Sequence, residues 1–101
     1  MTTPAIIAKI TAKPGKRDEL VAALQAMVDA TNDEPGTIQY LLHTDDGDAD
    51  VVWFYERYTD AAAVAAHSTS DAMKAVGLAV RDLAAGRPEL TMLTLVAGKG
   101  A

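Results

Sequence analysis

The sequence contains no cysteine, and this absence excludes several kinds of chemistry. Disulfide bonds, thiolate catalysis, iron–sulfur clusters and cysteine-ligated zinc all need a cysteine side chain. The two histidines, His43 and His67, have neither the HxH nor the HxxxH spacing of a metal site. Because transition metals bind through several such ligands held together, we expect no metal site.

Positive charge is also scarce, since nine Lys and Arg stand against fourteen Asp and Glu and the net charge is −5. Proteins that bind nucleic acid or an anionic membrane surface usually carry a basic stripe or cluster, and none occurs in this sequence. No stretch approaches the ~18 apolar residues of a membrane span. Residues 1–4 lack the pattern of a signal peptide. We therefore expect a cytoplasmic protein with no nucleic-acid and no membrane partner.

Three motifs of common enzymes are missing as well. The sequence contains no phosphate-binding glycine loop, no dinucleotide fingerprint and no GxSxG nucleophile elbow. An enzyme with this sequence would work with acid–base groups and the shape of a pocket. We therefore expect no organic cofactor.

What is present is the composition of a single globular domain, 1–101, with half of its residues hydrophobic and 23% charged. Hydrophobic periodicity predicts the order β-α-β-β-α-β, with the second helix broken near His67. This order is typical of a ferredoxin-like α+β fold, an antiparallel sheet with helices on one face and the first and third strands at its centre. The expected strands are 6–12, 37–44, 51–58 and 90–96. The first expected helix runs from Arg17 to the turn at 32–36. The second helix is expected in two parts, one over 61–66 and one from Ser70 or Asp71 to Gly86.

The third expected strand, 51–58, is apolar on both of its alternating faces. Val51, Trp53 and Tyr55 lie on one side of it, and Val52 and Phe54 on the other. Helices cover only one face of a ferredoxin-like sheet, and soluble monomers rarely expose a large apolar surface. We therefore expect a homodimer that packs sheet against sheet.

His67 is the first candidate for chemistry, because it follows the short alanine-rich helix and precedes a Ser-Thr-Ser segment. The pKa of a free imidazole lies near neutrality, which suits a general base or proton shuttle. The alternative is a helix-terminal histidine that only contacts the last carbonyls of the helix. His43, on the second strand, is expected at the surface or in an interface.

Other candidates lie on the third strand and on the long helix. Glu56 shares a strand face with Phe54 and Tyr58, so it is either a buried carboxylate with a raised pKa or a structural hydrogen-bond acceptor. Arg81 is either solvated or binds an anionic ligand oxygen. Gly77 either allows close packing or leaves room for a ligand. The aromatic residues Trp53, Tyr58 and Tyr40 have two possible roles. They either line a substrate pocket or belong to the core or interface.

Three segments together resemble the antibiotic biosynthesis monooxygenase family. They are the first strand followed by Lys13-Pro14-Gly15-Lys16 and a helix, the run from Glu34 to Tyr40, and the run from Glu56 to Asp60 that leads to Ala66-His67. The resemblance extends from Ile6 to about Val96. It implies a ferredoxin-like protomer and a homodimer whose sheets face each other, a dimeric α/β barrel.

The resemblance also implies an activity, the oxidation of a quinol or polycyclic phenolic substrate with dioxygen and without a cofactor. The substrate is deprotonated to an electron-rich anion, which passes an electron to dioxygen inside a dry aromatic pocket. In such a mechanism His67 would be the base or proton shuttle. Trp53 or Tyr58 would pack on the small aromatic substrate, and Arg81 would hold its oxyanion.

Two other activities remain open. One is an isomerase or lyase that uses His67 for proton transfer, and the other is a non-catalytic dimer that binds an apolar small molecule. Haem-degrading relatives carry an asparagine on the first strand, a tryptophan near the end of the short helix and a histidine ligand on the long helix. By motif matching, this sequence has Ala8, His67 and Gly77 at these three positions. Haem binding is therefore not expected.

Overall fold

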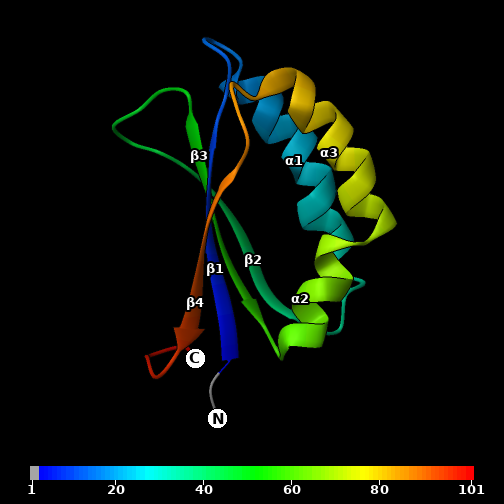
Figure 1. Ribbon diagram of the computed structural model, residues 1–101. Coiled ribbons are helices and arrows are strands. Elements are labelled where there is room, and N and C mark those ends of the chain that lie inside the picture. Colours follow the sequence, from blue (N-terminus) through cyan, green and yellow to red (C-terminus); the bar gives the residue numbers. More distant parts are fainter. Residues whose placement is uncertain (1–2) are drawn as a thin grey trace.

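The computed structural model describes residues 3–101 and has the β-α-β-β-α-β order that the sequence predicts (Figure 1). The second helical segment is divided into α2 and α3. The last strand ends one residue earlier than expected, and the first begins three residues earlier. The elements are β1 (Thr3–Thr11), α1 (Arg17–Thr31), β2 (Thr37–Thr44), β3 (Val51–Tyr58), α2 (Ala61–Ser68), α3 (Asp71–Leu83) and β4 (Glu89–Leu95).

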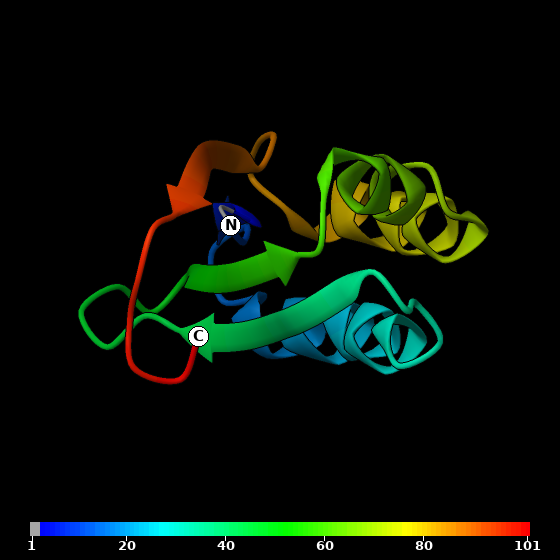
Figure 2. The ribbon, with the colours of Figure 1, turned by 90° about the horizontal axis from the view of Figure 1, so that it is seen from below.

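The four strands form one antiparallel sheet in the order β2-β3-β1-β4. The prediction that the first and third strands are central is therefore confirmed. All three helices lie on one side of the sheet, and α1 and α3 pack side by side (Figures 1 and 2). This is the ferredoxin-like α+β fold. No helix within residues 3–101 is long and apolar enough to cross a membrane.

Side-chain caps determine where α2 and α3 begin. The Asp60 carboxylate accepts a hydrogen bond from the Ala63 amide at 2.8 Å, and the Ser70 hydroxyl accepts one from the Met73 amide at 3.1 Å. Such caps satisfy amides that have no partner within the helix. The Ser70 hydroxyl also donates to the carbonyl oxygen of His67. His67 therefore lies in the last turn of α2, whereas the sequence placed it just after the helix.

The core lies between the helices and one face of the sheet. Helices α1 and α3 each contribute residues spaced three or four apart, as expected for one buried helix face. On α3, Val76 and Val80 are buried, and Ala79 is exposed. Buried core residues of α1 and the central strands are Leu20, Leu24, Met27, Ala8, Ile10, Val52 and Phe54.

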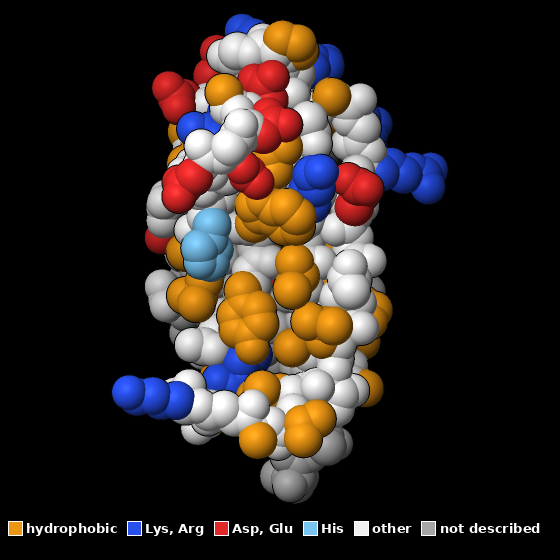
Figure 3. Space-filling view, turned by 90° about the vertical axis from the view of Figure 1, so that its left-hand side faces the viewer, with side chains coloured by type: hydrophobic (Ala, Val, Ile, Leu, Met, Phe, Trp, Pro, Cys, Tyr) orange, Lys and Arg blue, Asp and Glu red, His pale blue; other side chains and the backbone are white. Residues whose placement is uncertain are grey.

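The opposite face of the sheet has no helix over it and is rich in apolar side chains (Figure 3). Leu41 and Leu93 are 43% and 40% exposed there, although both belong to strands. We call this surface the open face and define it by Ile7, Leu41, Trp53, Tyr55 and Leu93, which the strand register brings to the same side. The sequence-based argument for a second apolar face therefore applies to this surface.

Candidate functional site

An apolar cavity of about 290 Å³ lies between the sheet and the helices. Side chains from β1, β2, β3, α1 and α3 form its wall, and Ser68, Gly77 and Leu90, which are exposed, lie at its rim. Wall residues that make it apolar include Ile10, Met27, Phe54, Met73, Val76 and Val80. An apolar concave space with a few polar groups is the usual form of a small-molecule site.

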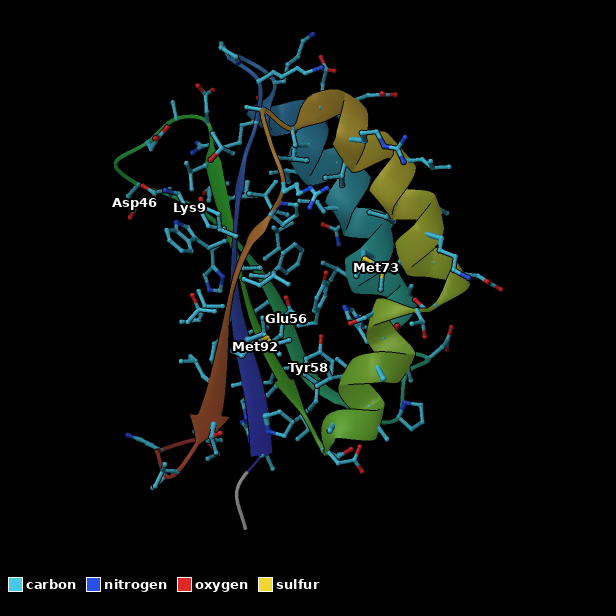
Figure 4. All side chains as sticks on the ribbon, viewed as in Figure 1. Lys9, Asp46, Glu56, Tyr58, Met73 and Met92 are labelled. Atoms are coloured by element: carbon cyan, nitrogen blue, oxygen red, sulfur yellow. The ribbon has the colours of Figure 1, made fainter. Side chains whose placement is uncertain are left out.

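Glu56 is the only carboxylate that the described residues contribute to this wall. It is 6% exposed, and alternation along β3 places it on the helix side of the sheet with Phe54 and Tyr58 (Figure 4). Burial raises the pKa of Glu56, while a hydrogen bond from Tyr58 and the nearby His67 partly oppose this shift. The sequence-based alternative of a buried carboxylate with a raised pKa thus agrees with the structure.

This raised pKa predicts how the stability of a Glu56→Gln variant depends on pH. When the folded-state pKa exceeds the unfolded-state value, the resulting stabilisation is fully present below the unfolded-state pKa and is lost as the pH rises through the folded-state pKa. Glutamine has no such proton to lose. Wild type should therefore lose stability relative to Glu56→Gln as the pH rises. The difference in the free energy of unfolding, Glu56→Gln minus wild type, should be larger at about pH 8 than at about pH 4. Urea unfolding at both pH values measures this difference, and a difference independent of pH would contradict the assignment.

His67 lies behind Glu56 and is 3% exposed. Its Nδ1 atom is 2.8 Å from Glu34 Oε1, and its Nε2 atom is 4.0 Å from Glu56 Oε1. Because a carboxylate only accepts hydrogen bonds, we assign the ring proton to Nδ1. The buried Nε2 atom has no hydrogen-bond partner among residues 3–101. The lone pair of Nε2 is therefore free on the side of the cavity.

Glu34 connects His67 to the surface. Its Oε1 atom also accepts a hydrogen bond from the Thr37 hydroxyl at 2.7 Å, and its side chain is 19% exposed. Glu34 and His67 line a shallow depression between the turn before β2 and helix α2. Gly36 keeps this turn close to α2, because a Cβ atom at Gly36 would overlap with the Cβ atom of Ala63.

Two tyrosines enclose the imidazole of His67. The Tyr40 ring lies 4.8 Å from it and stacks on Phe54 at 4.3 Å, and the Tyr58 ring lies at 5.4 Å (centroid distances). The Tyr58 hydroxyl donates to Glu56 Oε1 at 2.5 Å. Burial raises the pKa of both phenols far above their ordinary value, with a further rise from Glu56. Both therefore stay protonated at neutral pH, and Tyr58 is a hydrogen-bond donor to Glu56.

Among the residues that the sequence singled out, His67, Glu56, Tyr58 and Tyr40 lie together in this site, and Gly77 lies at the rim of its cavity. Trp53 does not join them, since it lies on the open face and donates from Nε1 to Asp45 at 2.7 Å. Arg81 does not join them either. It is exposed on α3 and borders a separate depression with Arg87.

Glu34 is the site residue that the sequence reasoning missed. It is 33 positions from His67, and this distance hides the contact from any local pattern. The available signal was an acidic residue in a Glu-Pro-Gly turn directly before a strand. Within residues 3–101, no group of three His, Cys, Asp or Glu side chains is arranged to hold a metal ion.

Comparisons with known proteins agree with this fold. A protein of Pseudomonas aeruginosa is similar at 29% identity, with a TM-score of 0.87 over 96% of this chain and 97% of the other. A candidate antibiotic biosynthesis monooxygenase of Caulobacter crescentus is similar at 25% identity, with a TM-score of 0.89 over 94% and 91% of the two chains. Another from Chloroflexus aurantiacus is similar at 26% identity, with a TM-score of 0.83 over 97% of each chain.

No curated protein sequence matches the chain. The family model described as "antibiotic biosynthesis monooxygenase" matches residues 5–77, which run from within β1 into α3 and include the site residues Glu34, Glu56 and His67. The resemblance seen in the sequence is thus confirmed, and the chain belongs to the antibiotic biosynthesis monooxygenase family.

Proposed function

We propose that this protein is a monooxygenase that oxidises a quinol or phenol with dioxygen and needs neither a metal nor an organic cofactor. The observation that carries the proposal is a single carboxylate, Glu56, with a raised pKa in an otherwise apolar cavity wall. A carboxylate with a raised pKa is a stronger base toward a phenolic hydroxyl. The apolar wall keeps ordered water away from the reactive anion.

The proposed reaction begins when Glu56 takes the proton of the substrate hydroxyl. The electron-rich anion passes an electron to dioxygen. For a phenol, one oxygen atom of dioxygen becomes a carbonyl oxygen of the quinone formed. For a quinol, it becomes the hydroxyl oxygen of a hydroxyquinone. In both cases the other oxygen atom leaves as water with two hydrogens from the substrate. Tyr40 packs against the ring, and Tyr58 orients Glu56. His67 does not line the cavity, so it is the proton shuttle behind Glu56 and does not itself contact the substrate.

The size of the cavity narrows the substrate class. An engineered apolar cavity of about 150 Å³ binds one benzene molecule. The cavity here, about 290 Å³, is about twice as large and suits two fused rings. No Lys, Arg or His of the described residues lines it, which disfavours an anionic substrate. We therefore propose a neutral quinol or phenol with one or two rings.

The test is oxygen uptake by the purified protein with a panel of one-ring and two-ring hydroquinones and naphthols. We expect uptake with formation of a quinone from naphthols and of a hydroxyquinone from hydroquinones, fastest for two-ring substrates. Conversion of a substrate at the same rate without oxygen would instead support an isomerase or lyase that uses His67. Saturable binding without conversion would support a non-catalytic binding protein. The absence of uptake with the whole panel would contradict the proposal.

We further propose that a second copy of the chain covers the open face, so that two sheets pack against each other. Apolar side chains dominate this face. Arg57 lies on the same face, two residues after Tyr55 on β3, and its buried Nε atom has no hydrogen-bond partner among residues 3–101. Burying such a surface is favourable, and leaving it in water is rare in monomers.

We expect light scattering at micromolar concentration to give the mass of a dimer. A Leu93→Glu variant should be monomeric, because a charge within an apolar interface is costly to desolvate. Leu78→Glu is the matched control, since Leu78 is exposed on α3, away from the open face. A monomeric wild-type protein would contradict the proposed dimer.

A further inference from the structure

We propose that Glu34, His67 and Glu56 form a proton path from the apolar cavity to the surface depression beside α2, with Glu34 as the residue that positions His67. This inference rests on the proposed function, because the proton of the substrate hydroxyl must move away from the anion before dioxygen reacts, and an equivalent proton must return when water forms. The three side chains come from the turn before β2, the last turn of α2 and the middle of β3. We call them the proton row.

The need for a path follows from the position of Glu56. It is almost fully buried even when the cavity is empty. A ring bound against it would cover its remaining access to water through the rim at Ser68, Gly77 and Leu90. The proton that Glu56 takes from the substrate therefore needs a second exit.

The contacts of His67 fit a proton relay better than a purely structural role. Buried nitrogen atoms are nearly always hydrogen-bonded, because an unsatisfied one is costly. Here one ring nitrogen is bonded to Glu34, and the other is buried without a partner at 4.0 Å from Glu56. This distance is longer than a hydrogen bond, but such contacts in ligand-free sites often shorten when a ligand binds.

The steps conserve the proton. Glu56 receives it from the substrate hydroxyl and passes it to Nε2 of His67. Nδ1 of His67 then releases its own proton to Glu34, which gives it to water in the depression. When water forms from the second oxygen atom, the row runs in reverse: Glu34 takes a proton from the depression and passes it to Nδ1, and Nε2 returns its proton to Glu56, which delivers it to that oxygen. His67 is then again the neutral Nδ1–H tautomer, and Glu56 is a carboxylate.

The surroundings of His67 favour proton transfer through its ring. Facing it are two carboxylates, Glu34 and Glu56, and two phenols, Tyr40 and Tyr58, all from the β2 and β3 side. The carboxylates stabilise a transient imidazolium, while the phenols do not compete for its proton. Asp33 and Asp60 line the depression at the outer end of the row. The residues of α1 and α3 that line the cavity are uncharged.

The test compares Glu34→Gln with Glu19→Gln, a control that makes the same substitution at an exposed position of α1 outside the depression. The side-chain oxygen of the introduced glutamine can still accept the hydrogen bond from His67, but the amide cannot take up the proton. We expect kcat to fall by about 10²-fold, at the low end of general acid–base contributions. The Kd for a redox-inactive two-ring phenol should change by less than about twofold, and the solvent deuterium isotope effect on kcat should rise.

A second measurement needs no turnover and keeps the two proposals separate. The ¹⁵N chemical shifts of His67 in the wild-type protein should be those of the neutral Nδ1–H tautomer. If His67 carries its proton on Nε2, the proton row is wrong whatever the activity. If wild type oxidises quinols and Glu34→Gln keeps its kcat and isotope effect, the row is wrong and the proposed function stands. If wild type oxidises none of the panel, the proposed function fails and the row, which rests on it, falls too.

Discussion

Replacing Glu56 by glutamine should lower kcat/KM for a two-ring quinol by about 10²–10⁴-fold, the usual contribution of a positioned general base. The amide has nearly the shape of the carboxylic acid, and its oxygen can still accept the hydrogen bond from Tyr58. The wall of the cavity therefore stays intact while its base is lost. Loss of activity without loss of folding is the expected result.

The measurement is oxygen uptake at saturating and subsaturating quinol, with circular dichroism to check the fold. Glu19→Gln is the matched control, because Glu19 is exposed in the first turn of α1. It should keep the wild-type rate. A Glu56→Gln protein with more than about a tenth of the wild-type kcat/KM would remove Glu56 from the role of base.

The second large effect is expected from filling the rim of the cavity. Gly77 lies at this rim on α3, and no atom lies within 4 Å of the position that its Cβ would occupy. Gly77→Phe should therefore be accommodated without a backbone clash, and phenylalanine has a higher helix propensity than glycine. The new ring would block part of the space that a two-ring substrate needs.

We expect kcat/KM for two-ring quinols to fall by about 10–200-fold or more, the range for a small steric change in an apolar pocket. One-ring quinols should be affected less, and the melting temperature should not fall. Leu78→Phe is the matched control, since it adds a ring at the next, exposed position outside the cavity wall. Equal losses for one-ring and two-ring substrates would contradict a substrate bound at this rim.

The sequence predicted the fold well, because the fold depends on local and periodic signals. Hydrophobic periodicity indicated the helices, and the start expected for the last helix, Ser70 or Asp71, includes its N-cap residue Ser70. Topological rules then correctly placed β1 and β3 at the centre of the sheet. None of these steps required knowledge of a particular side-chain contact.

The site was only partly predictable, because its residues meet through long-range packing. Alternation along β3 grouped Glu56 with Tyr58 and separated both from Trp53, but it did not tell which group faces the helices. The answer depends on how α1 and α3 cross the sheet. Arg81 follows the buried Val80 directly on α3, so its exposure depends on the rotation of that helix. Glu34 lies in a turn, where no periodicity applies.

The central claim is that the substrate hydroxyl meets Glu56 inside the cavity. A crystal structure of the protein with a redox-inactive two-ring phenol tests it most directly. We predict a hydroxyl oxygen within about 3.2 Å of a Glu56 carboxylate oxygen, with the rings between Tyr40 and α3. A ligand bound instead on the open face beside Trp53, or in the depression beside Glu34, would contradict the account.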